Sequence, residues 1–132
     1  MKEVLTIRVA ITDCLEVKGK SECARMILFD GTCDCEYFKG KVLPGGVDTQ
    51  KDFAGKETML SARYILEGQD SEGRNCRIFI ENNGQVDKNG QISAIPHIIT
   101  DSNALSFLEN AELKSTVEGI EGGVLVHIFL MS

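Results

Sequence analysis

The residues best suited to chemistry follow a Pro-Gly-Gly turn and recur along the next strand-like segment. Pro44-Gly45-Gly46 ends one expected strand and is followed by the carboxylate of Asp48. Further on, Ser61, Arg63 and Glu67 share one face, because alternate residues of a strand point to the same side. Asp48 suits a general base or a hydrogen-bond acceptor, and Arg63 offers a planar fork for a carboxylate or phosphate. We therefore predict a ligand-binding set of Asp48, Ser61, Arg63 and Glu67 and assign no catalytic residue.

The same residues also have a simpler structural interpretation. A carboxylate such as Asp48 commonly caps backbone N–H groups in its own turn. If the face of Arg63 points outward, Arg63 and Glu67 belong to cross-strand ion pairs with Arg77 and Glu81, each worth roughly 0.2–1 kcal/mol. The sequence leaves open which face lines the interior.

Three aromatic or imidazole side chains are predicted to be structural. Tyr64 lies on the apolar face of its segment, which favours a core residue whose hydroxyl finds a partner. His127 interrupts the most apolar strand and is expected to be a hydrogen-bonded core residue. His97 follows Pro96 in an expected extended or loop segment. No Asp or Glu adjacent in sequence marks either histidine as part of a catalytic dyad.

The chain has five cysteines and no Cys-x-x-Cys pair, so neither a disulfide framework nor a zinc ribbon is indicated. On a strand, Cys33 and Cys35 would share a face about 6.6–7 Å apart, at the limit of disulfide geometry. Reduced thiols are expected, and a zinc site with His97 or His127 is the weaker alternative. We predict no metal and no cofactor.

Size and charge narrow the class of protein. A chain of 132 residues fits a single domain, 1–132, with its own core. Twenty acidic residues against 14 basic ones give a net charge of −6, which disfavours nucleic acid as a partner. No apolar run approaches the roughly 20 residues of a membrane helix. We expect no membrane association and a cytoplasmic location.

Period-2 alternation predicts an all-β protein with at most one short helix. Asp30-Gly31 is typical of a hairpin turn between two strands. We predict a polar loop at 47–55 and one or two helical turns within 103–109. Segments 57–67 and 74–83 form a hairpin, and 124–131 is the last strand. Eight or more short strands favour one closed antiparallel β-barrel. The last strand is apolar on both faces apart from His127, which predicts a homo-oligomer formed through this region.

The glycine-rich turn and the strand after it resemble a known family. The resemblance is to the domain-of-unknown-function 3237 family, also catalogued as uncharacterised protein family 0311. The matching residues are Gly40, Val42, Leu43, Pro44, Gly45, Gly46, Asp48, Leu60, Ala62, Arg63, Tyr64, Leu66 and Glu67. Thr49 and Ser61 depart from the aromatic residue and the Asp usual in that family. The resemblance implies a small closed barrel and brings no established reaction.

Three functions are compatible with these observations. The first is a barrel that binds a small organic molecule in its lumen, for which we expect a cavity of at least ~300 Å³ with convergent polar groups. The second is a metal-independent enzyme performing isomerase-type or cyclase-type acid–base chemistry in the same cavity. The third is a structural homo-oligomer with no ligand, whose lumen is filled by side chains.

Overall fold

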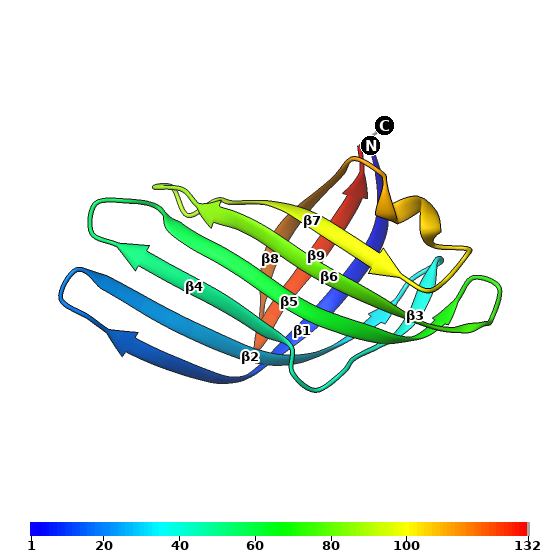
Figure 1. The fold of residues 1–132 in the computed structure, drawn as a ribbon, viewed down its shortest axis with the longest axis horizontal. Coiled ribbons are helices and arrows are strands. Elements are labelled where there is room, and N and C mark those ends of the chain that lie inside the picture. The colour runs from blue at the N-terminus through cyan, green and yellow to red at the C-terminus, as the bar shows by residue number, and fades with distance from the viewer. Residues whose placement is uncertain (132) are drawn as a thin grey trace.

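The computed structural model describes residues 1–131 and contains nine strands and one short 3₁₀ helix (Figure 1). The elements are β1 (Lys2–Lys18), β2 (Glu22–Asp34), β3 (Phe38–Val42), β4 (Val47–Phe53), β5 (Thr58–Asp70), β6 (Asn75–Val86), β7 (Ile92–Thr100), η1 (Ser106–Glu109), β8 (Leu113–Ile120) and β9 (Gly123–Leu130). In the described residues no helix is long and apolar enough to cross a membrane.

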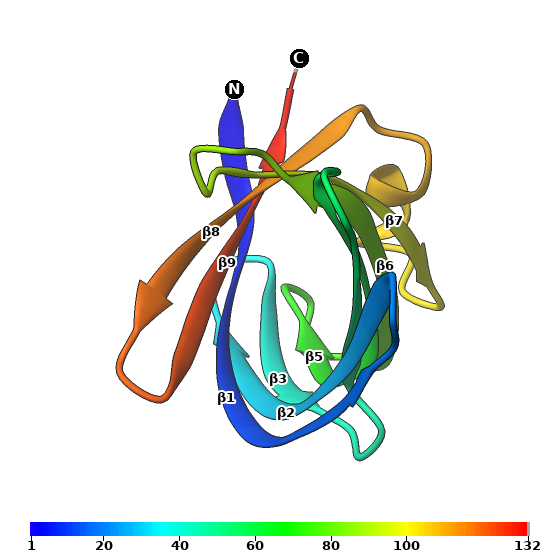
Figure 2. The same ribbon diagram turned by 90° about the vertical axis from the view of Figure 1, so that its left-hand side faces the viewer.

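The strands close into an antiparallel ring. Strand β1 pairs with β2 on one side and with β9 on the other, and the sheet continues through β8, β7 and β6 to β5. Strands β3 and β4 both lie between β2 and β5, each pairing with both neighbours. The view along the barrel in Figure 2 shows the sheet curling round on itself. The predicted all-β, closed antiparallel barrel is confirmed.

Two sequence predictions within this fold are wrong. Asp30 and Gly31 do not form a turn; they lie inside β2, where they pair with Ala10 and Val9 of β1. The 47–55 segment is not a loop, because Val47–Phe53 forms β4 and bridges β2 and β5. The expected helical turn within 103–109 is present as η1, Ser106–Glu109.

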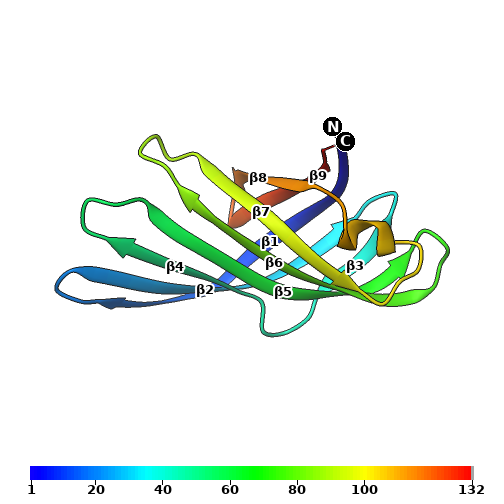
Figure 3. The ribbon, with the colours of Figure 1, turned by 45° about the horizontal axis from the view of Figure 1, so that its top comes forward.

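One end of the barrel is closed and packed, whereas the other is extended. Leu105 and Leu108, in and beside η1, join the buried core with Phe38, Ile78 and Ile128. At the opposite end the β1–β2, β4–β5 and β6–β7 turns project as long hairpins (Figure 3). These core residues pack the end of the barrel that lies next to η1.

The ring has its shortest strand ladder between β7 and β8. Within residues 1–131, only Ala94 and Ser115 pair across this seam, and β8 is held mainly by its long ladder with β9. Side chains reinforce the seam: the Asn82 amide donates to Ser115 Oγ at 2.9 Å. Both residues are buried, so their hydrogen bonds are shielded from water.

Candidate functional site

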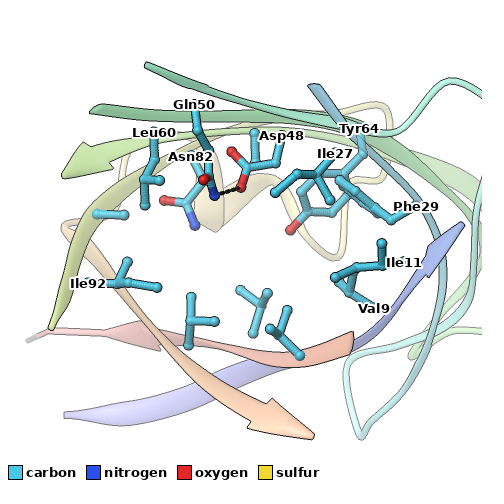
Figure 4. Close-up of a pocket in the computed structure, with 15 residues that line it drawn as sticks. Val9, Ile11, Ile27, Phe29, Asp48, Gln50, Leu60, Tyr64, Asn82 and Ile92 are labelled. Carbon is cyan, nitrogen blue, oxygen red and sulfur yellow. Dashed lines mark hydrogen bonds between the residues drawn. The ribbon is translucent and has the colours of Figure 1, made fainter. Parts of the chain in front are cut away.

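A partly enclosed cavity of about 150 Å³ lies inside the barrel (Figure 4). Strands β1, β8 and β9 contribute only apolar side chains to it, and β4, β5 and β6 contribute the polar ones. The residues that line it are Val9, Ile11, Ile27, Phe29, Asp48, Gln50, Leu60, Ala62, Tyr64, Asn82, Ile92, Ala94, Val117, Val124 and Val126. The cavity is therefore an apolar chamber with one polar wall.

Asp48 is the one carboxylate among the described residues that line this chamber. Strand β4 places it between Ile27 and Ala62 of the neighbouring strands. Its Oδ2 accepts a hydrogen bond of 2.9 Å from Gln50 Nε2, whereas its Oδ1 is buried and has no partner among the described residues. Burial raises the pKa of the Asp48 carboxyl, although the hydrogen bond from Gln50 and the nearby backbone of Ser61 oppose the rise.

Tyr64 reaches into the cavity from the adjacent strand, β5 (Figure 4). Its ring packs edge-on against Phe29, with the centroids 5.3 Å apart. The side chain is buried as expected, but the predicted partner for its hydroxyl is missing: the oxygen is buried and makes no hydrogen bond with any residue of 1–131. Burial raises the pKa of Tyr64, which keeps the hydroxyl protonated and able to donate.

A polar chain connects Asp48 to the extended end of the barrel. Arg25 Nη1 lies 2.6 Å from Asp52 Oδ2, and both Arg25 Nε and Nη2 lie 3.4 Å from Gln50 Oε1. Gln50 in turn donates to Asp48. The sequence did not predict Arg25, Gln50 or Asn82 as site residues. The alternation Asp48, Gln50, Asp52 would have placed Gln50 beside Asp48 if 47–55 had been interpreted as a strand.

The other predicted site residues lie outside the cavity. Ser61 Oγ donates to Asn83 Oδ1 at 2.6 Å, and Arg63 Nε forms an ion pair of 2.6 Å with Glu81. Arg77 Nε pairs with Glu67 at 2.8 Å. The side chains of Arg63 and Glu67 are 60% and 44% exposed. Ser61, Arg63 and Glu67 therefore do not converge with Asp48, because the even-numbered face of β5 is the one turned inward.

Only one of the two histidines departs from its predicted setting. His97 lies within β7 and is exposed, opposite Glu81. His127 is not a core residue; it lies on the outer face of β9, with Nδ1 3.2 Å from Glu3 and Nε2 3.0 Å from Glu118. The hydrogen bond to Glu3 is the main cause of its raised pKa. Within residues 1–131, no cluster of three or more His, Cys, Asp or Glu side chains is arranged to hold a metal ion.

Comparison with known proteins places the chain in a family. Residues 1–114 match the family described as "Protein of unknown function (DUF3237)". The chain belongs to this family. A UPF0311 protein of Clostridium acetobutylicum is 40% identical over 57 residues, which cover 43% of this chain. That match spans only about a third, 34%, of the relative.

Solved structures share the whole fold. A protein of unknown function from Clostridium acetobutylicum superposes with a TM-score of 0.84 at 25% identity, covering 99% of this chain and 98% of its own. A β-barrel-like protein from Acinetobacter baumannii gives a TM-score of 0.81 at 15% identity, with coverage of 99% and 94%. The barrel is thus an architecture that this chain shares with both proteins over nearly its whole length.

Proposed function

We propose that the protein binds a small, mainly apolar organic molecule in the barrel cavity, with Asp48 and Tyr64 as its polar contacts. The observation that carries this proposal is the pair of buried atoms, Asp48 Oδ1 and Tyr64 Oη, that have no partner in residues 1–131 and lie on the wall of one apolar cavity. A buried polar atom without a partner costs about 1–3 kcal/mol. A ligand that supplies both hydrogen bonds recovers that cost on binding.

The cavity limits the size of the ligand. At about 150 Å³ it falls below the ~300 Å³ expected from the sequence for a typical pocket. An apolar cavity of about this volume accommodates one benzene ring in another protein. The ligand class is therefore a single-ring or short branched molecule that carries a hydroxyl, carbonyl, amine or carboxyl group on one edge.

The alternative function is metal-independent acid–base catalysis in the same cavity. It is favoured by the raised pKa of Asp48, which brings a carboxyl closer to the range useful for proton transfer near neutral pH. The protonated Tyr64 hydroxyl on the adjacent strand would then hydrogen-bond a carbonyl or an oxyanion of the substrate. Binding is common to both functions, so a ligand must be found first.

A structural homo-oligomer with a filled lumen is the least supported of the three. Within residues 1–131 the cavity leaves two polar atoms without partners, whereas a lumen filled for stability alone would leave none. Self-association through the C-terminal strand remains a proposal compatible with ligand binding. It is supported by Leu125 and Phe129, which lie half-buried beside His127 on the outer face of β9.

Thermal-shift screening against single-ring alcohols, ketones, amines and carboxylic acids tests the proposal. At about 100 times its dissociation constant, a ligand adds about 2.7 kcal/mol to the free energy of unfolding, which gives a visible rise in Tm. We expect Asp48→Asn to weaken a hit by roughly tenfold, because an NH2 donor replaces one of the two acceptor oxygens, and Tyr64→Phe to weaken it by roughly fivefold, because the buried hydroxyl is lost.

Arg63→Ala is the matched control, since it removes a polar side chain from the outer face of the same strand as Tyr64. It should leave the affinity unchanged. A hit that survives both cavity variants but is lost in Arg63→Ala would place the site on the outer face. A broad panel with no hit would contradict ligand binding of this size class.

A further inference from the structure

Cys33 and Cys35 form a close pair of thiols at the β2–β3 connection. Their sulfur atoms lie 3.8 Å apart, which is contact distance for two unbonded sulfurs. An extended strand would separate residues i and i+2 by about 6.6–7 Å between Cα atoms. Strand β2 ends at Asp34, so Cys35 lies at the start of a tight turn, which is closed by its N–H donating to the Phe38 carbonyl at 3.0 Å.

The two thiols differ in their surroundings. Cys33 is 3% exposed and belongs to the hydrophobic core. Cys35 is half-buried, and its sulfur lies 3.3 Å from the Phe38 carbonyl oxygen and 3.5 Å from that of Val4. One thiol is thus accessible to a small reagent, while the other lies behind it in the core.

Cys35 is also the thiol that ionises first. A hydrogen bond from the Cys33 thiol lowers the pKa of Cys35 below its ordinary range. The same contact, together with burial, raises the pKa of Cys33 well above its ordinary range. The thiolate is the nucleophile in disulfide exchange, so the more exposed member of the pair is the attacking group.

We propose that Cys33 and Cys35 are a thiol–disulfide exchange site that reacts with a low-molecular-weight disulfide and closes to an intramolecular disulfide. In the first step the Cys35 thiolate attacks one sulfur of the reagent, forming a mixed disulfide and expelling one thiolate. In the second, Cys33 attacks the Cys35 sulfur, passes its proton to solvent base and expels the other thiolate. The reagent is reduced to two thiols, and the protein loses two hydrogen atoms.

The second step requires only a local movement. The two sulfurs must approach from 3.8 Å to about 2.05 Å. Among residues 1–131 the other three cysteines lack such a thiol partner: Cys14 and Cys23 face Ile27 and Lys18 across the β1–β2 ladder, and Cys76 faces Gly68. Exchange at those positions would stop at a mixed disulfide.

Mass spectrometry of the folded protein after incubation with 2-hydroxyethyl disulfide tests the proposal. Trypsin cleaves after Arg25 and Lys39, so one peptide, residues 26–39, contains both Cys33 and Cys35 and no other cysteine. After blocking free thiols with iodoacetamide, this peptide should be lighter than its reduced form by two hydrogens and carry no label. The peptides with Cys14, Cys23 and Cys76 should carry either label or reagent.

Two variants make the test specific. Cys33→Ser should trap the mixed disulfide on Cys35, because the second step has lost its nucleophile. Cys14→Ser is the matched control and should leave closure unchanged. Recovery of the 26–39 peptide with both cysteines alkylated, or with a persistent mixed disulfide in the unsubstituted protein, would overturn the proposal. Closure that occurs only in urea would do the same, because it would not depend on the folded turn.

Discussion

Asp48 faces the cavity with an unpaired carboxylate oxygen, which suits ligand binding but destabilises the fold when the group is charged. Among the described residues only one of its two oxygens has a partner, and the other lies in an apolar chamber. A charged carboxylate in that position loses hydration without full compensation. The polar chain from Arg25 through Gln50 reduces this cost but leaves the pKa raised.

The raised pKa predicts how Asp48→Asn changes stability with pH. Protonated Asp48 is favoured by the fold, so its contribution to stability is complete below the ordinary pKa of 3.8 and is lost as pH rises through the folded value. Asparagine cannot ionise and escapes this loss. Relative to the unsubstituted protein, Asp48→Asn should therefore become more stable as pH rises from about 4 to about 7.

Urea unfolding at several pH values measures this difference. Asp52→Asn is the matched control from the same face of β4, and its effect on stability should stay nearly constant from about pH 4 to about 7 and shrink only at lower pH. The hydrogen bond from Arg25 lowers the pKa of Asp52, so the native carboxylate stabilises the fold above pH 3.8 and loses this effect on acidification. Parallel trends in the two variants would contradict the assignment of Asp48 to a desolvated site.

The sequence pointed to Asp48 but grouped it with residues that the structure places on the outer face of the barrel. Ser61, Arg63 and Glu67 share a face, as predicted, but period 2 alone does not say which face is inside. The apolar set Leu60, Tyr64 and Leu66 was the better guide, because the inner wall of a small barrel is mainly apolar. Arg25 reaches the site through the long-range pairing of β2 with β4, which no local pattern contains.

At the scale of elements, glycines determine how closely strands approach. Gly31 illustrates the point: Asp-Gly commonly marks a hairpin, yet Gly31 has no positive φ and lies mid-strand. A Cβ there would lie 2.7 Å from the Arg8 carbonyl oxygen. The glycine permits close approach of β1 to β2 rather than a turn, and that requirement is invisible without knowledge of the partner strand.

The pairing of β3 with β5 depends on the same property. Gly40 and Gly68 face each other in this ladder, and a Cβ on Gly68 would lie 2.5 Å from Gly40 Cα and 2.8 Å from the Lys39 carbonyl carbon. Because these are backbone atoms, they cannot rotate away. We expect Gly68→Ala to lower the free energy of unfolding by about 1–3 kcal/mol.

Gly119→Ala is the control, measured by urea unfolding alongside Gly68→Ala. Gly119 lies in β8 without a positive φ, and no atom of the described residues lies within 4 Å of the position that an added Cβ would occupy. Alanine there should be neutral or stabilising by about 0.5 kcal/mol through the lower entropy of the unfolded chain. Equal destabilisation of both variants would show that steric contact at Gly68 is not the cause.

At the scale of the whole molecule, ring closure is the property that the sequence predicted best. Short alternating segments separated by turns required a sheet with one apolar face, and closure buries that face without leaving long edges. The pattern did not reveal how β3 and β4 divide the space between β2 and β5. Nor did it show that a single residue pair joins β7 to β8 in the described chain, because both features depend on where distant strands meet.

The β7–β8 seam leads to a prediction about Ser115. Its hydroxyl oxygen accepts a hydrogen bond of 2.9 Å from the Asn82 amide. Its one proton can be donated either to Asn82 Oδ1 at 3.1 Å or to the Ala94 carbonyl oxygen at 3.3 Å. Ser115→Ala leaves the buried side-chain amide of Asn82 without this partner at the shortest ladder of the ring. We expect a loss of about 1–3 kcal/mol in the free energy of unfolding.

Ser61→Ala is an equivalent change on the outer face, where the Ser61 hydroxyl donates to Asn83 at 2.6 Å. Water replaces that bond, so the loss should stay within about 0.5 kcal/mol.

Hydrogen exchange adds a spatial readout: in Ser115→Ala the amides of β7 and β8 should exchange faster, while those of β5 and β6 remain protected. Uniformly faster exchange around the ring would mean that Ser115 supports the core in general. Faster exchange confined to the seam would identify β7–β8 as the place where the barrel opens, and the adjacent Asn82 and Ala94 of the cavity wall would move with it.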